Sequence, residues 1–108
     1  MSWPGRCSGV LLHPTSLPGR WGAGDFGPEA RSFVHWLESA GQRLWQFLPT
    51  TPAGAGGSPY SSPSAFAGNP MLISIDDLIE AGLLGDEPEL AELAAAPDNA
   101  VDFALLSR

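Results

Sequence analysis

PEARSFVHWLESAGQRLWQFLP, residues 28–49, contains a helix, its end and a strand, and it decides how the chain folds. Pro28 suits the first helical position, and apolar residues recur on one face at positions 30, 33, 34, 37 and 40. Gly41 is the expected left-handed end of a helix over residues 28–40. Residues 44–48 then form a short apolar run stopped by proline, which indicates a buried strand.

The segment before this helix predicts a matching strand. Residues 9–13, GVLLH, are apolar without alternation, as is typical of parallel strands covered on both faces. Residues 14–27 hold two prolines and four glycines without periodicity, which indicates a loop. The order is that of a βαβ unit with two parallel strands and a right-handed crossover. Because one helix cannot cover both faces of such a sheet, we expect the opening of a larger α/β fold.

The segment after the second strand, residues 50–70, has the sequence TTPAGAGGSPYSSPSAFAGNP. Four prolines and four glycines exclude a helix. A shaped surface loop that presents Tyr60 to a ligand fits this composition, and a tyrosine that only packs fits it equally. Sugar rings offer an apolar face for such an aromatic side chain, and Ser58 would supply a hydroxyl.

The last third of the chain predicts short elements. Residues 71–75 are expected to be a further extended segment. Asp76 is the expected N-cap of a helix over residues 77–81 that Gly82 ends. Residues 88–95, rich in Ala, Glu and Leu, predict another short helix.

Charge and cysteine content limit the classes of function. The net charge is −7, all five cations are arginines, and nine of the twelve carboxylates follow Ile75. No basic stripe is present for nucleic acid or for a membrane surface, so a neutral partner is expected. Cys7 is the single cysteine, which excludes an internal disulfide and favours a cytoplasmic setting. No signal peptide or membrane span is expected, and no activating base suggests a nucleophilic Cys7.

The individual motifs give weak signals. Residues 22–27 spell G-x-G-x-x-G, but a proline-containing stretch separates them from the strand, which argues against a dinucleotide site. His13 and His35 share no metal-ligand spacing, so neither a metal nor another cofactor is expected. His13 ends the first strand, where α/β folds bind ligands, and it either lines a site or makes a structural hydrogen bond. The sequence shows no second carboxylate that would form an acid–base pair with Asp25. A hydrogen bond that its carboxylate accepts from the loop backbone would account for this residue.

Four ordered motifs identify a family. SGVLLHPTSLPG, GAGDFGPEA, AGQRLWQFLP and GSPYSSPSAFAGNPMLI strongly resemble the N-terminal part of 4-α-glucanotransferases, the amylomaltases of glycoside hydrolase family 77. The resemblance covers about residues 6–84. It implies that the strands and helix above are the first elements of a (β/α)8 TIM barrel over residues 1–84. Residues 85–108 would then begin a helical insertion.

The resemblance also implies the chemistry. That family moves an α-1,4-glucan segment to a malto-oligosaccharide or glucose acceptor by a retaining double displacement. The catalytic carboxylates lie downstream of the matched part, so this chain is expected to contain none and to be inactive alone. Because two parallel strands and one helix leave apolar side chains without partners, the chain is also expected to be poorly stable alone. Tyr60 and Ser58 take the roles of sugar-contacting residues, with His13 as a further candidate. The alternative is a non-catalytic glucan-binding or structural remnant, and an unrelated α/β binding domain is a third interpretation.

The chain departs from the family pattern around Tyr60. The family commonly reads GYGDSPYQSFSAF, whereas this chain has Ala55 and Gly57 in place of the first tyrosine and the aspartate. Ser61 and Pro63 replace the glutamine and phenylalanine that follow. The sugar contacts of those four side chains are therefore in doubt, and Tyr60 itself is intact.

Overall fold

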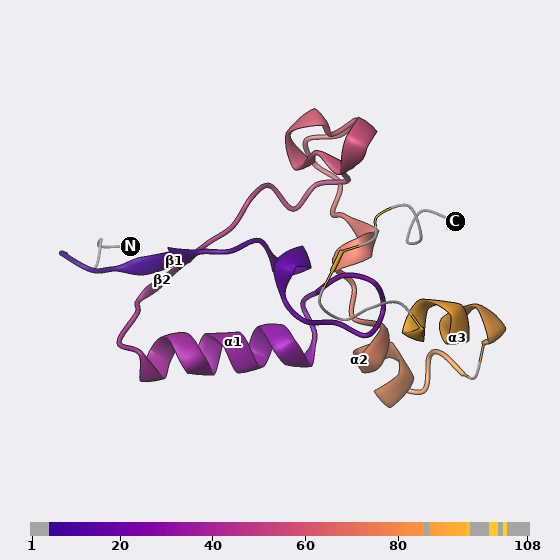
Figure 1. The fold of residues 1–108 in the computed structure, drawn as a ribbon. Helices are drawn as coiled ribbons and strands as arrows, with labels where there is room; N and C mark the ends of the chain where they lie inside the picture. The colour runs from indigo at the N-terminus through magenta and orange to yellow at the C-terminus, as the bar shows by residue number, and fades with distance from the viewer. Residues whose placement is uncertain (1–4, 86, 96–99, 102, 104–108) are drawn as a thin grey trace.

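The computed structural model describes residues 5–85, 87–95, 100, 101 and 103 as an α/β arrangement (Figure 1). Strands β1 (Gly9–Leu11) and β2 (Leu44–Gln46) pair in parallel, and helix α1 (Pro28–Ser39) lies between them in the sequence. Two short helices follow, α2 (Ile75–Glu80) and α3 (Pro88–Ala94). The predicted order of strand, helix and parallel strand is confirmed.

Both strands are two residues shorter than the predicted strands over residues 9–13 and 44–48. One further ladder bond, from the Leu12 amide to the Gln46 carbonyl at 2.9 Å, extends the pairing beyond β1. The chain then enters a 3-10 turn at Pro14–Ser16. Proline has no backbone N–H for the ladder, so the strand ends before His13 rather than after it.

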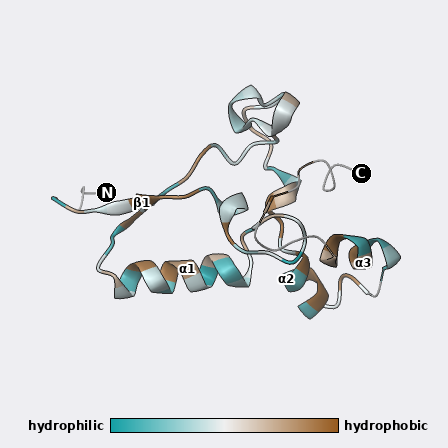
Figure 2. Ribbon diagram, viewed as in Figure 1, coloured by the Kyte–Doolittle hydropathy of each residue, from teal (hydrophilic) through white to brown (hydrophobic). Residues whose placement is uncertain are grey.

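The ends of α1 agree with the sequence. Pro28 occupies the first turn, and the helix stops one residue before the predicted end at position 40. Gly41 follows with a φ of +71°, which confirms the predicted left-handed cap. Figure 2 shows apolar and polar residues alternating along this helix.

The buried face of α1 is narrower than the predicted stripe. Ala30 and Leu37 are buried, and the Phe33 ring meets the Trp45 ring edge-on with centroids 5.0 Å apart. Val34 is 49% exposed, so the prediction is wrong at that position. Leu11 of β1 is 61% exposed as well, and this apolar surface agrees with the expected lack of cover over two strands and one helix.

The loop between β1 and α1 carries most of the buried core among the described residues. Pro14 is fully buried, and Leu17, Trp21 and Ala23 are buried around it. The loop closes on itself through a bond from the Gly24 amide to the Thr15 carbonyl at 3.0 Å. A segment without periodicity therefore contributes buried apolar side chains to the core.

The segment before α2 differs from the prediction. Residues 71–75 are not extended, because a 3-10 turn occupies Pro70–Leu72. Ser74, and not Asp76, is the N-cap of α2, since its Oγ accepts from the Asp77 amide at 3.1 Å. A serine two residues earlier can cap the helix as well as an aspartate, so the helix starts earlier than predicted. Gly82 has a φ of +71° and ends the helix as predicted.

Candidate functional site

A cavity of about 200 Å³ lies where the chain leaves β1 and β2. Its walls come from the turn after β1, from the segment after β2 and from Phe103 near the end of the chain. Parallel strands direct their carboxyl ends to the same edge, which is where α/β folds hold ligands. The lining residues are His13, Thr15, Ser16, Leu48, Ala53, Gly57, Pro59, Asn69 and Phe103.

His13 is the ionisable residue of this lining. The Nδ1 atom of its ring is buried and has no hydrogen-bond partner among the described residues. The side chain also makes no cap bond to the 3-10 turn that follows it. Burial lowers the pKa of His13 below its usual 6.5, which favours the neutral ring. Of the two interpretations left open by the sequence, the structural hydrogen bond is therefore not observed.

Ser58 and Tyr60 lie on the segment that forms one wall of the cavity. The Ser58 Oγ accepts from the Tyr60 amide at 3.3 Å and caps a 3-10 turn at Pro59–Ser61. The Tyr60 side chain is 74% exposed and is not part of the cavity lining, although Gly57 and Pro59 are. Ser58 thus shapes the backbone that carries Tyr60.

Backbone bonds fix the shape of this loop. The Gly54 amide donates to the Ser58 carbonyl at 2.9 Å, and the Asn69 amide donates to the Thr50 carbonyl at 2.8 Å, joining the two ends. In Figure 1 the turns of residues 55–61 stand away from α1 and α2. The segment is a shaped surface loop, as predicted, and Phe66 is a second aromatic on it, 100% exposed.

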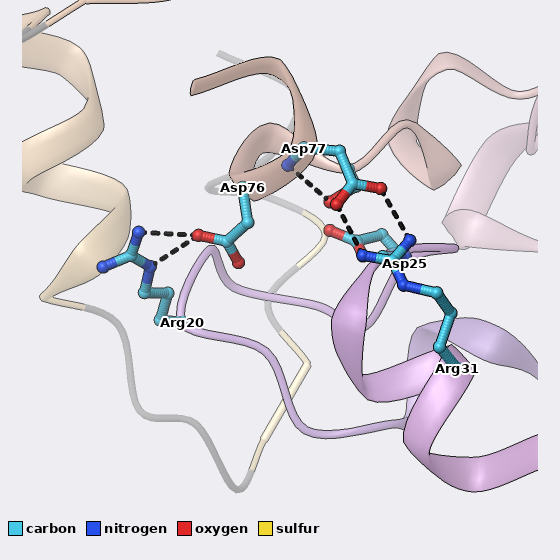
Figure 3. Close-up of polar contacts among 7 residues, drawn as sticks. Arg20, Asp25, Arg31, Asp76 and Asp77 are labelled. Carbon is cyan, nitrogen blue, oxygen red and sulfur yellow. Dashed lines mark hydrogen bonds and ion pairs between the residues drawn. The ribbon is translucent and has the colours of Figure 1, made fainter. Parts of the chain in front are cut away.

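Two arginines join the first half of the chain to α2, as Figure 3 shows. Arg20 donates to the Asp76 carboxylate at 2.6 and 3.0 Å, and Arg31 makes a two-bond pair with Asp77 at 2.7 and 2.9 Å. The Arg31 bond lowers the pKa of Asp77. Both pairs are exposed and screened by solvent, so they add little to stability and serve to position α2.

Asp25 bonds loop backbone, as the sequence allowed. Its Oδ1 accepts from the Gly27 amide at 2.8 Å. Burial raises the pKa of Asp25, the Gly27 bond opposes that shift, and the charges of Asp76 and Asp77 add to it. The carboxyl group therefore orders the start of α1. It also lines a surface pocket with Glu29 and Asp76, and Asp76 is paired with Arg20.

Other candidates from the sequence remain apart from the cavity. Cys7 is a free, partly exposed thiol. The exposed His35 lies 4.0 Å from the Glu38 carboxylate, one turn along α1. Among the described residues there is no group of three or more His, Cys, Asp or Glu that could hold a metal ion. No described helix has the length and apolar character needed to cross a membrane.

Sequence reasoning missed several residues of the cavity wall. Thr15 and Ser16 follow His13 directly, so the end of a strand was a usable signal for them. Asn69 caps the 3-10 turn at Pro70–Leu72, and a capping residue before proline is a signal of turn structure rather than of a site. Phe103 carries no local signal, because only the fold brings it beside the loop.

Known proteins share this arrangement. Residues 12–108 match the family described as 4-alpha-glucanotransferase, glycoside hydrolase family 77. The chain is 50% identical to the 4-alpha-glucanotransferase of Thermus thermophilus over 101 residues, 94% of this chain and 19% of that protein. It is 47% identical to the chloroplastic/amyloplastic 4-alpha-glucanotransferase of Solanum tuberosum over 106 residues, 94% of this chain and 18% of that protein.

A solved structure of an amylomaltase has a similar fold over most of this chain. The amylomaltase from Streptococcus agalactiae in complex with acarbose superposes with a TM-score of 0.82 at 45% identity. The superposition covers 92% of this chain and 20% of that one. The chain therefore spans about a fifth of the length of the relatives that it matches.

Proposed function

Because this chain belongs to the 4-alpha-glucanotransferase family, we propose that the protein carrying it transfers α-1,4-glucan segments. The donor is a malto-oligosaccharide, and the acceptor is another malto-oligosaccharide or glucose. The observation that supports this most directly is the superposition on an amylomaltase at 45% identity over 92% of the chain. The acarbose in that structure, a sugar, supports a glucan-type ligand here.

The elements of this chain correspond to the start of a larger proposed fold. We propose that β1, α1 and β2 are the first elements of a (β/α)8 barrel over residues 1–84, and that residues 85–108 begin a helical insertion. The active face of such a barrel is at the carboxyl ends of its strands, the side on which the His13 cavity opens. A cytoplasmic location stays a prediction.

The chemistry proposed for the whole protein is a retaining double displacement, with catalytic carboxylates outside these residues. The contacts of three described carboxylates support catalytic carboxylates elsewhere in the protein. Asp76 and Asp77 are paired with arginines, and Asp25 accepts a hydrogen bond from loop backbone. The part of the site in this chain binds sugar: Tyr60 contacts the ring, Ser58 shapes the loop, and His13 lines the cavity.

Incubation of the complete gene product with maltotriose tests this function. We expect glucose and maltodextrins longer than maltotriose, and no transfer by the 108-residue chain alone. Absence of both products from the complete protein refutes the transferase. Binding of maltotriose without transfer supports the alternative, a glucan-binding remnant, and reading the DNA beyond the codon of Arg108 separates the two independently.

A further inference from the structure

The side chain of His13 lines the cavity and is a candidate hydrogen-bond donor to a ligand. We propose that neutral His13 donates a hydrogen bond from its Nε2–H to an oxygen of a single glucosyl unit held in this cavity. The proposal rests on the proposed function and names the ligand group that His13 contacts.

The ring is neutral because no described residue of the cavity lining stabilises a positive charge on it. Apart from His13, the described lining residues carry only hydroxyl, amide or apolar side chains or are glycine, so none of them places a carboxylate against the imidazole. Burial of the ring lowers the pKa of His13. An imidazolium also carries an N–H on both nitrogens, and one of these would be buried at Nδ1 without an acceptor.

The same buried nitrogen decides where the single proton of the neutral ring lies. A buried N–H without an acceptor costs the desolvation of a donor, and the Nδ1 atom has no partner among the described residues. Buried N–H groups without a partner are rarer in proteins than under-satisfied acceptors, so a bare lone pair is the better tolerated state at that position. The proton therefore sits on Nε2, and the group that His13 offers to a ligand is a donor.

The cavity suits one sugar ring. Its volume of about 200 Å³ lies below the about 300–1,000 Å³ of pockets for drug-sized ligands. Asn69 uses its Oδ1 to accept from the Met71 amide at 3.0 Å, which leaves its NH₂ group for a ligand. With Phe103 as an apolar wall and no charged side chain among the other described lining residues, the cavity matches an uncharged polyol better than an anion.

Substitutions that separate the two ring nitrogens test the proposal in the complete gene product. The amide of His13→Gln reaches the position of Nε2 and restores a donor there, whereas His13→Asn fills the position of Nδ1. We expect kcat/KM for maltotriose and the affinity for acarbose to fall about five- to tenfold in His13→Asn and His13→Ala. His13→Gln should stay within about twofold of the wild type, as should the surface control His35→Ala.

Nitrogen NMR of histidine-labelled wild-type protein tests the tautomer without relying on any variant's folding. We expect an unprotonated Nδ1 and a protonated Nε2 for His13, and a change at Nε2 when acarbose binds, with no change at His35. A protonated Nδ1, rescue by asparagine instead of glutamine, or full activity of His13→Ala overturns the inference while the transferase stands. A wild-type protein that neither binds acarbose nor converts maltotriose overturns the proposed function itself.

Discussion

Truncation of Tyr60 separates a sugar contact from a structural role. The side chain is 74% exposed, and the bond that holds its backbone runs from its own amide to the Ser58 Oγ. Tyr60→Ala leaves that bond and the capped turn intact. We therefore expect the free energy of unfolding to change by no more than about 0.5 kcal/mol, as for other surface substitutions.

The effect on catalysis follows from the ring area that a sugar would cover. If a glucosyl unit removes about 60 Å² of the exposed ring from water, the contact is worth about 1.5 kcal/mol at about 25 cal/mol per Å². A loss of about 1.4 kcal/mol is tenfold in rate. Tyr60→Ala should therefore lower kcat/KM for maltotriose about tenfold, and Tyr60→Phe, which keeps the ring, should lose much less.

The assay is glucose release from maltotriose by the complete protein, with stability measured by urea denaturation in parallel. Phe66→Ala is the control, because Phe66 is a fully exposed aromatic on the same loop. Unchanged kcat/KM in Tyr60→Ala would show that the ring makes no productive contact. An equal loss in Phe66→Ala would show that the loop, and not Tyr60, is what the substitution perturbs.

Four further substitutions test the packing and electrostatics that support the site, each measured by urea denaturation of the complete protein. Gly24→Ala places a Cβ against the Pro14 carbonyl oxygen and should lower the free energy of unfolding by about 1–3 kcal/mol. Gly68→Ala places its Cβ in open space and should raise the free energy of unfolding by about 0.4–1 kcal/mol. Ser74→Ala removes the cap of α2 and should cost about 1 kcal/mol. The pKa of Asp25 is raised above its usual 3.8, so its ionised form opposes folding: Asp25→Asn should stabilise once the pH exceeds the raised pKa, and the gain should vanish below about pH 4. A constant gain across that range would contradict the assigned cause.

The sequence predicted the elements that local rules determine. Proline at position 28 and glycine at position 41 bound α1 because both act through their own backbone, and the structure has the helix between them. The strand ends were overestimated because hydrophobicity continues through Leu12 while hydrogen bonding stops at the proline. The prediction that Asp76 caps α2 was wrong, and Ser74 is the cap. Both residue types cap helices, and only the geometry distinguishes them.

Features that depend on distant pairs could not be predicted from one sequence. The loop over residues 14–27 reads as irregular, yet Leu17 and Trp21 are buried in it, since burial without a period leaves no pattern. The pair of Arg31 with Asp77 joins positions 46 residues apart, and an exposed arginine on a helix gives no sign of it. The end of a strand pointed to His13, which lines the cavity, whereas Phe103 reaches the same cavity only through tertiary packing.

Gly57 shows how the departures from the family pattern fit this chain. Its φ is +74°, a conformation that side chains rarely adopt, and a Cβ would lie 3.0 Å from the Phe103 ring. An aspartate at this position, as in the family pattern, would therefore require both a different backbone and a displaced ring. Because Gly57 and Phe103 line the same cavity as His13, the glycine and the aromatic wall form one arrangement. Restoration of the aspartate alone should destabilise this loop rather than recover a sugar contact, whereas Gly57→Asp combined with Phe103→Ala should relieve the steric part of that cost.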